Sequence, residues 1–222
     1  MAQKNSSSDV KIMRINMFYE PKKKNHGLAH NPFNSLIVPR PIGWISSLGL
    51  DGVPNLAPYS FFNAVSYQPP TVMFSSGTAA TEDGLKDSLR NIEDTKEFVC
   101  NMATWDWRNE MNESSKSVAL AIDEIAMTGL TTIDSRLVSA PRLAEAPVNL
   151  ECIYLKSVSV PGWSDADNFK IIIGEVIGVH IKDEFINQEG LVDIKALQPI
   201  GRLGGNDYAV VNAQSFFSLK RP

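Results

Sequence analysis

The sequence between residues 36 and 65 reads LIVPRPIGWISSL, GLDGVP and NLAPYSFFNAV, and this stretch decides the fold. The first segment, 36–48, is an apolar run of β type that is interrupted by prolines. An Asp-Gly pair, Asp51-Gly52, then separates it from a second apolar segment, which is a strong β-hairpin signal. We therefore predict that residues 55–65 form the returning strand. Pro58 cannot donate to a strand ladder, so this strand must lie at an edge or carry a bulge.

Further short elements are expected on the C-terminal side of this hairpin. Apolar runs predict strands over residues 71–74, 98–102, 149–160 and 169–181. Leu85, Leu89 and Ile92 recur at helical spacing, and Asp87 and Ser88 are suitable cap residues for that helix. The polar stretch 105–121 predicts a second helix, and 137–147 a proline-bearing connector.

The expected architecture is a single mainly β domain. Many short strands, few helices and frequent turns (14 Gly and 13 Pro) favour a β-barrel with peripheral helices. Residues 1–24 are polar and contain the basic run Lys22-Lys23-Lys24, so we expect a flexible N-terminal arm there. The domain would then comprise residues 25–222.

Composition limits the partners of this chain. The 222 residues carry a net charge of −4, which makes the protein a poor general binder of nucleic acid. An anionic ligand must therefore be held by a local site. No apolar run is long enough to cross a bilayer, and the N-terminus has no secretory apolar region, so we expect no membrane partner. Cys100 and Cys152 each lie in apolar sequence, which predicts buried, reduced thiols and a cytoplasmic protein.

Common hydrolase and metal motifs are missing from the sequence. His26 and His30 are four residues apart, but Gly27 and Pro32 favour a loop over a metal-binding helix. We expect no metal and no catalytic side chain of the triad type. His180 is expected at an exposed strand edge, with a ligand contact as the alternative.

The polar residues that could bind a ligand are concentrated between residues 40 and 88. Hydroxyl and amide side chains cluster at strand ends there: Ser46, Ser47, Asn55, Ser60, Asn63, Ser66, Ser75 and Ser76. Lys86-Asp87-Ser88 follows at a predicted helix start, where backbone N–H groups, a hydroxyl and a lysine can hold a phosphate. Trp44, Tyr59, Phe61 and Phe62 add flat apolar surface. A planar heteroaromatic ring with a phosphate tail suits this set, and ordinary core packing of the aromatic residues is the alternative.

Several segments occur in the order typical of one known family. They are PRPIGWISS (39–47), NLAPYSFFN (55–63), PP (69–70), KDSLRNI (86–92), EFVCN (97–101), APVNLEC (146–152), IGEV (173–176) and RLGG (202–205). Together they resemble the flavin reductase-like, FMN-binding split-barrel family, and in particular its flavoredoxin-like branch. The segment KDSLRNI is similar to the family's KD[ST]xxNI segment. The resemblance covers about residues 30–212.

This resemblance implies a split β-barrel that forms a homodimer, with one FMN per subunit near the dimer interface. The isoalloxazine ring would lie along residues 43–47 and 57–63, with backbone amides toward its N5 and carbonyl edge. The phosphate would be met by Ser75, Ser76, Lys86 and Ser88. The full expected set of cofactor-binding residues is Arg40, Trp44, Ile45, Ser46, Ser47, Ala57, Pro58, Tyr59, Ser60, Asn63, Ser75, Ser76, Lys86, Asp87 and Ser88.

One departure from the family leaves the electron donor open. Many of its NAD(P)H-dependent members carry a Gly-Asp-His segment before the strand that ends in Gly-x-Val. Here residues 167–176 read DNFKIIIGEV, and Phe169 stands where the histidine would be. The first hypothesis is an oxidoreductase that moves a hydride from NAD(P)H through FMN, for a partner monooxygenase or another acceptor. The second is an FMN electron carrier that is reduced by a redox protein and lacks a nicotinamide site. A binding module without flavin is a third possibility, which the intact 40–63 and 86–88 segments disfavour.

Overall fold

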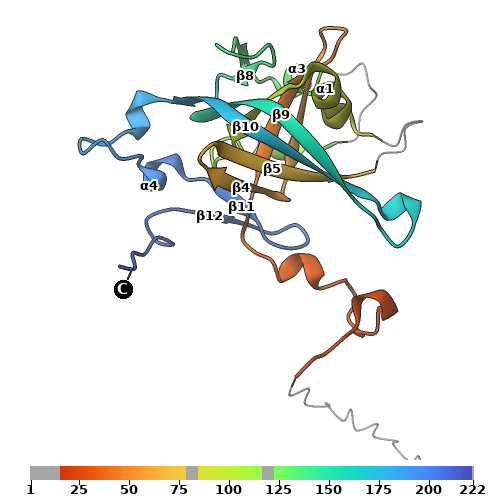
Figure 1. Cartoon of the computed structure of the whole chain (residues 1–222). Coiled ribbons are helices and arrows are strands. Elements are labelled where there is room, and N and C mark those ends of the chain that lie inside the picture. The colour runs from red at the N-terminus through yellow and green to blue at the C-terminus, as the bar shows by residue number, and fades with distance from the viewer. Residues whose placement is uncertain (1–15, 79–84, 117–122, 222) are drawn as a thin grey trace, which may run out of the picture.

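The protein was analysed as a computed structural model, which describes residues 16–78, 85–116 and 123–221. Its largest part is a seven-stranded antiparallel sheet that curls into a barrel (Figure 1). In spatial order, the strands of this sheet are β3 (Pro54–Tyr59), β2 (Gly43–Leu48), β6 (Glu97–Met102), β9 (Val148–Val160), β10 (Phe169–Ile181), β5 (Pro70–Gly77) and β4 (Phe62–Tyr67). The predicted mainly β architecture with few helices is confirmed.

Within the described residues, two smaller sheets and four short α-helices surround the barrel. One sheet contains β1 (Arg40–Pro41), β11 (Ile200–Arg202) and β12 (Tyr208–Val210), and the other contains β7 (Thr132–Ile133) and β8 (Arg142–Leu143). The helices are α1 (Asp87–Thr95), α2 (Arg108–Glu113), α3 (Glu124–Thr128) and α4 (Ile194–Leu197). Single 3₁₀ turns occur at Pro21–Lys23, Phe33–Ser35, Asp165–Asp167 and Asp183–Phe185.

The predicted hairpin is present, but its second half is not one strand. β2 and β3 pair antiparallel from Leu48↔Pro54 onward, and Gly52 takes the left-handed φ of 81° that the turn needs. β3 ends at Tyr59, and residues 62–67 form β4 at the opposite end of the sheet order. A single strand over 55–65 was therefore wrong. Phe61 lies in the corner between the two strands, where its carbonyl accepts a 2.8 Å hydrogen bond from the Ser75 amide and joins this corner to β5.

β2 (Gly43–Leu48) lies next to the edge strand β3, and both of its faces are buried. Ile45 belongs to the apolar cluster inside the barrel, together with Phe74 and Phe98. Trp44 points the other way, into a second cluster that includes Met111 of α2. Its indole N–H donates to the Ser114 hydroxyl at 2.9 Å, which satisfies the one polar group of this fully buried side chain.

Two predicted helices differ from the observed ones. α1 begins at Asp87 with Lys86 as its N-cap residue, and no side chain caps it, so the expected caps Asp87 and Ser88 are wrong. α2 covers only part of the predicted stretch 105–121, of which residues 117–121 lie outside the described part of the chain. The strands expected near 98–102, 149–160 and 169–181 are confirmed within one residue.

The segment before β1 contains two 3₁₀ turns. The turn at Pro21–Lys23 lies away from the barrel in Figure 1, whereas Ser35 of the second turn packs against Gly204 in the loop between β11 and β12. The proposed division into an arm (1–24) and a domain (25–222) remains a prediction. No helix within 16–78, 85–116 and 123–221 is long and apolar enough to cross a membrane.

Candidate functional site

The predicted site residues of β2 are buried and already have partners. Trp44, Ile45, Ser46 and Ser47 have no exposed surface. The Ser46 hydroxyl donates to the Pro141 carbonyl, and Ser47 accepts a hydrogen bond from the Asn91 side chain. The backbone of β2 pairs with β3 on one side and with β6 on the other. These four residues are therefore buried in the frame of the barrel, and their contact with a cofactor remains a prediction.

The corner after β3 presents aromatic rings with a cation beside each one. The Lys86 ammonium lies 5.7 Å from the centroid of the Tyr59 ring, and the Arg40 guanidinium lies 5.6 Å from that of Phe61. Phe169 contacts Phe61 with 6.0 Å between ring centroids. Lys86 and Arg40 can pair with a negatively charged group of a ligand at this corner.

Beneath this corner a chain of buried polar groups connects α1 to α3. The Ser88 hydroxyl donates to Asn55 Oδ1 at 2.5 Å, and the Asn55 amide donates to both carboxylate oxygens of Glu124 at 3.0 Å. Glu124 also accepts from the Leu56 amide and so caps the outer edge of β3. Since a serine has one hydroxyl proton and Asn55 receives it, Ser88 cannot also donate that proton to a ligand.

The Tyr59 hydroxyl is the other buried polar group at this position. It makes no well-formed hydrogen bond within the described chain. Burial raises the pKa of Tyr59 to about 12, an effect that the nearby hydroxyls of Ser88 and Ser76 partly offset. Tyr59, Ser76 and Ser88 are therefore brought together as predicted. A tyrosine with this pKa stays protonated at neutral pH and can act only as a neutral donor or acceptor.

The remaining predicted phosphate residues are distributed over two faces. Lys86 is exposed, whereas the Asp87 carboxylate beside it pairs with Arg90 at 3.0 Å. Ser75 and Ser76 are consecutive on β5, so their side chains point to opposite faces of the sheet. Only Ser76 shares a face with the buried Phe74 and lies near Tyr59.

Asn63 also points away from this group. It is exposed on β4, and its side-chain oxygen accepts from the Ala64 amide.

Arg40 borders a cavity of about 230 Å³ next to the aromatic corner. The cavity is lined in part by Pro58, Ser60 and Phe61, and also by Arg202 and Tyr208. Arg40 donates to the carbonyls of Asn34 and Ile37, but its Nε is buried with no hydrogen-bond partner in the part of the chain that is described. Burial and the nearby Arg202 charge lower the pKa of Arg40. An acceptor in this cavity would satisfy the orphan Nε.

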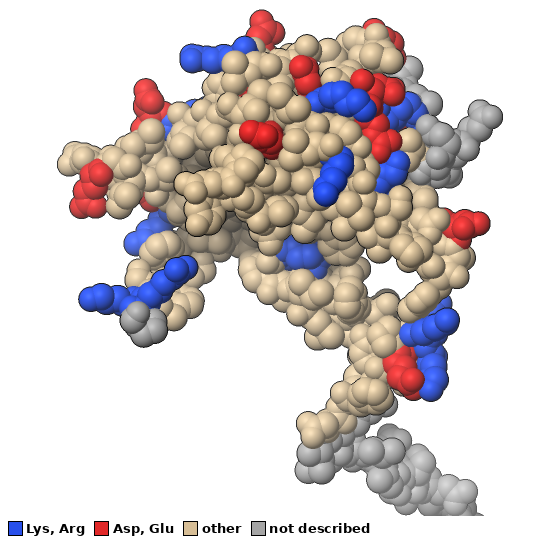
Figure 2. Space-filling view, in the orientation of Figure 1, with Lys and Arg blue, Asp and Glu red and all other residues tan. Residues whose placement is uncertain are grey.

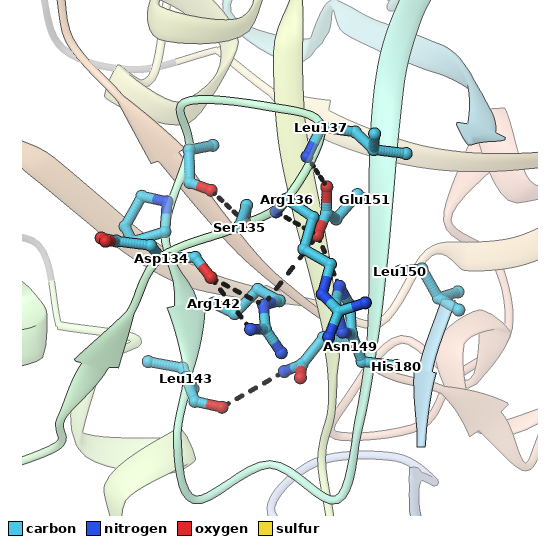
Figure 3. A network of polar contacts seen from close by, with 12 residues as sticks. Asp134, Ser135, Arg136, Leu137, Arg142, Leu143, Asn149, Leu150, Glu151 and His180 are labelled. Atoms are coloured by element: carbon cyan, nitrogen blue, oxygen red, sulfur yellow. Dashed lines mark hydrogen bonds and ion pairs between the residues drawn. The ribbon is translucent and has the colours of Figure 1, made fainter. Parts of the chain in front are cut away.

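His180 has a defined partner away from this corner. Its Nε2 lies 2.5 Å from Oε1 of Glu151, a carboxylate with no exposed surface (Figure 3). Glu151 also accepts from the backbone amides of Arg136 and Leu137 and so fastens the loop before β8 onto β9. Burial alone would raise the pKa of Glu151, but these amides and His180 together lower it. His180 is thus half-buried in a structural ion pair.

Sequence reasoning missed several residues of this site. Arg202 was named only within the segment RLGG, and the buried Glu124 and Glu151 were not identified. Both glutamates lie within apolar sequence, AIDEIAM and NLECIYL, which could have indicated that they are buried. Figure 2 shows acidic and basic side chains interspersed on one face, with no broad field of one sign. Arg40 and Arg202 place two positive charges beside one cavity of a chain whose net charge is −4.

Known proteins resemble this chain over most of its length. The sequence model of the flavin reductase like domain matches residues 35–197. An uncharacterised protein of Aquifex aeolicus is 38% identical over 173 residues, which cover 78% of this chain and 85% of that protein.

Two solved structures have the same arrangement of strands. Nitrilotriacetate monooxygenase component B from Bacillus cereus is 29% identical, with a TM-score of 0.82 over 92% of this chain and 98% of the other. The flavoredoxin of Desulfovibrio vulgaris shares the fold at 21% identity, with a TM-score of 0.68 over 82% of this chain and 90% of the other. The expected split barrel is thereby confirmed.

Proposed function

The chain belongs to the flavin reductase-like domain family, and from that premise we propose that it is an oxidoreductase that binds FMN at the Tyr59–Phe61 corner. The observation that carries this proposal is the pair of aromatic rings with Lys86 at one end and Arg40 at the other. FMN combines an aromatic ring system with a phosphate, which matches rings flanked by cations. The orphan Arg40 Nε supports this fit, because it requires an acceptor that the described chain does not supply.

The residues of the corner would divide the binding between them. Ala57, Pro58, Ser60 and Phe61 would orient the ring, with Arg40 as a donor to its polar edge. Lys86 would meet the phosphate with Ser76, while Ser88 and Asn55 hold the start of α1 in place from below. Bound FMN supplies the hydride and electron transfer, and the protein supplies binding, orientation and exclusion of water.

NAD(P)H is the proposed electron donor, and a partner monooxygenase is the proposed acceptor. The nitrilotriacetate monooxygenase component supports a role of this type, since its name describes one component of a monooxygenase system.

A specific observation also favours the electron-carrier alternative. The Phe169 ring lies against Phe61, and a Cβ placed on Gly77 would be 3.3 Å from it, so an aromatic side chain covers the corner where the family has a histidine. Under this alternative a redox protein reduces the FMN.

A binding experiment tests the proposal. We expect the purified protein to bind FMN with a shift of the flavin absorbance bands. We also expect Lys86→Ala to weaken FMN binding about tenfold while riboflavin, which has no phosphate, is bound as before. Lys220→Ala removes the same charge from the exposed C-terminal tail and serves as control. Absence of any spectral shift would overturn the proposal, and equal losses for FMN and riboflavin would remove Lys86 from the phosphate site.

A second measurement separates the two donors. Bleaching of bound FMN by NADH or NADPH in stopped flow supports the reductase, and its absence supports the carrier. Phe169→His, which restores the residue of the family, is expected to speed the bleaching.

The proposed setting is the cytoplasm, with the protein acting as a homodimer. Cys100 and Cys152 are both buried and free, in agreement with a reducing compartment.

A further inference from the structure

A second cavity, of about 730 Å³, lies between α2 and the β11–β12 hairpin. The residues that give it its chemistry are Trp105, Arg108, Asn112, Arg202, Asn206 and Tyr208. Its volume is within the range of small-molecule sites. It shares Met111, Ser115, Arg202 and Tyr208 with the Arg40 cavity, so the two cavities are neighbours with a common wall.

Positive charge without a carboxylate partner distinguishes this region. Each arginine of the large cavity lies on an aromatic ring: the Arg108 guanidinium is 4.0 Å from the centroid of Trp105, and that of Arg202 is 4.5 Å from the centroid of Tyr208. Among residues 16–78, 85–116 and 123–221, no Asp or Glu lines either cavity and neither arginine forms an ion pair. On a chain with a net charge of −4, this is a built concentration of positive charge.

The arginines are also held in a geometry suited to anions. Arg108 donates to the Trp105 carbonyl at 2.5 Å, and Arg202 donates to the Tyr208 hydroxyl and to the Gly205 carbonyl. Stacking fixes the plane of each guanidinium and leaves its remaining N–H groups free for a carboxylate or phosphate. Trp105 is 44% exposed, which leaves part of the indole beside Arg108 open to a planar ring.

We propose that this cavity binds a second, anionic substrate: a planar aromatic molecule that carries one carboxylate or phosphate, held by Arg108 and Arg202. Arg202 lines both this cavity and the one beside the corner assigned to FMN. That the bound molecule would react with the flavin therefore rests on the proposed function. An aromatic carboxylate and a nucleotide phosphate both have this chemistry, and they can be distinguished by experiment.

Calorimetric titration of the purified protein tests the proposal. The probes are benzoate and 5′-AMP, each with a neutral counterpart, benzamide and adenosine. We expect at least one anion to bind at millimolar concentration or below and to bind more weakly as salt is raised, while its neutral counterpart does not bind. Binding of benzoate alone identifies an aromatic carboxylate as the substrate, and binding of 5′-AMP alone identifies a nucleotide.

Two variants locate the site. Arg108→Gln is expected to weaken binding of the anion about tenfold, because it removes a hydrogen bond between two charged groups. Arg221→Gln removes an exposed arginine from the C-terminal tail and is the matched control. Arg108 contacts only Trp105 among the interactions above, so this variant tests the site without disturbing β11–β12.

Three results would overturn the proposal. They are no binding of either anion, equal binding of the neutral counterparts, or equal affinities of the Arg108→Gln and Arg221→Gln proteins. The titrations need no bound flavin, so their result is independent of whether the protein binds FMN. A protein that binds the anion but not FMN keeps this site and loses the proposed function.

Discussion

Two buried glutamates have environments that move their pKa values in opposite directions. Glu151 accepts hydrogen bonds from two backbone amides and pairs with His180. These contacts together lower the pKa of Glu151 although its burial alone would raise it. Glu124 is buried with weaker compensation from Leu56 and Asn55, so its pKa is raised. A group whose pKa is lowered on folding stabilises the protein at pH values above its unfolded pKa. A carboxyl group whose pKa is raised stabilises it below the unfolded pKa, and this contribution is lost as the pH rises through the folded pKa. The pH dependence of unfolding can therefore distinguish them.

The first prediction concerns Glu151. Its stabilisation is complete above the unfolded pKa and is lost as the pH falls through the lower folded pKa. Glu151→Gln should cost about 3 kcal/mol of unfolding free energy near neutral pH, because it leaves His180 and Arg142 without the buried carboxylate. It should also flatten the loss of stability in acid. Urea denaturation across acidic pH measures both effects, with Glu189→Gln, an exposed glutamate, as control. Equal curves for the two variants would contradict this prediction.

The second prediction concerns Glu124. Because its folded pKa is raised, the wild-type protein should lose stability as the pH increases from the unfolded pKa through the folded one. Glu124→Gln keeps an oxygen for the Leu56 amide and cannot ionise. As the pH rises through that interval, the unfolding free energy of the variant should therefore increase relative to that of the wild type. The same urea series measures it. A constant difference between variant and wild type across this pH range would show that Glu124 does not titrate there.

Individual residues mark the limit of what the sequence could predict about the site. The family resemblance implied a group of Ser75, Ser76, Lys86 and Ser88. The structure places Ser76, Ser88 and Lys86 near Tyr59, while Ser75 points to the other face of β5. The orientation of each hydroxyl does not follow from motif order. Ser46 and Ser47 look like ligand residues in the sequence, but their hydroxyl oxygens accept hydrogen bonds from the side-chain amides of Asn101 and Asn91. Arg202 lies beside Arg40 because β11 pairs with β1. The two residues are 162 positions apart in the chain, so no local pattern indicates their contact.

At the scale of single elements, Gly174 explains how β10 passes the barrel core. A Cβ at this position would lie 2.4 Å from the ring of the buried Phe98, and a register shift between β10 and β9 begins there. We predict that Gly174→Ala costs about 2 kcal/mol, since Phe98 is enclosed and cannot move aside. Gly77→Ala is the matched control, because its Cβ would meet only the half-exposed Phe169 ring at 3.3 Å. Thermal unfolding compares them, and equal losses would refute this account of β10.

The long strands could be predicted from the sequence, whereas the division of the segment 55–65 into two strands could not. β9 and β10 were found within one residue because each is a long run of apolar and β-branched residues, bounded by Pro161 and by Lys182-Asp183. The segment 55–65 was predicted as one strand because its apolar character continues through Ser60 and Phe61. It divides because the Phe61 carbonyl pairs with the Ser75 amide, and a tertiary contact of this kind leaves no local pattern.

At the scale of the whole molecule, the outer side of β9 is unusually apolar. Ile153, Leu155, Val158 and Val160 are each more than two-fifths exposed. Val158 and Val160 pair with Ile171 and Phe169 of β10, so this strip reaches the strand end at which Phe169 contacts Phe61. Contiguous apolar surface of this kind marks interaction sites in soluble proteins. We expect a second copy of the chain to cover it, beside the corner assigned to FMN.

This arrangement predicts that dimer formation and cofactor binding depend on the same strip. Val158→Asp places a charge within it and should convert the dimer to a monomer, because an unpaired carboxylate would otherwise be buried in the interface. Gln188→Asp adds the same charge in an exposed loop outside the strip and should leave the dimer intact. Sedimentation velocity measures the mass, and FMN titration of the same samples measures affinity. If the second copy completes the flavin site, the Val158→Asp monomer binds FMN more weakly. A wild-type monomer, or a Val158→Asp dimer of unchanged stability, would show that β9 is not the interface.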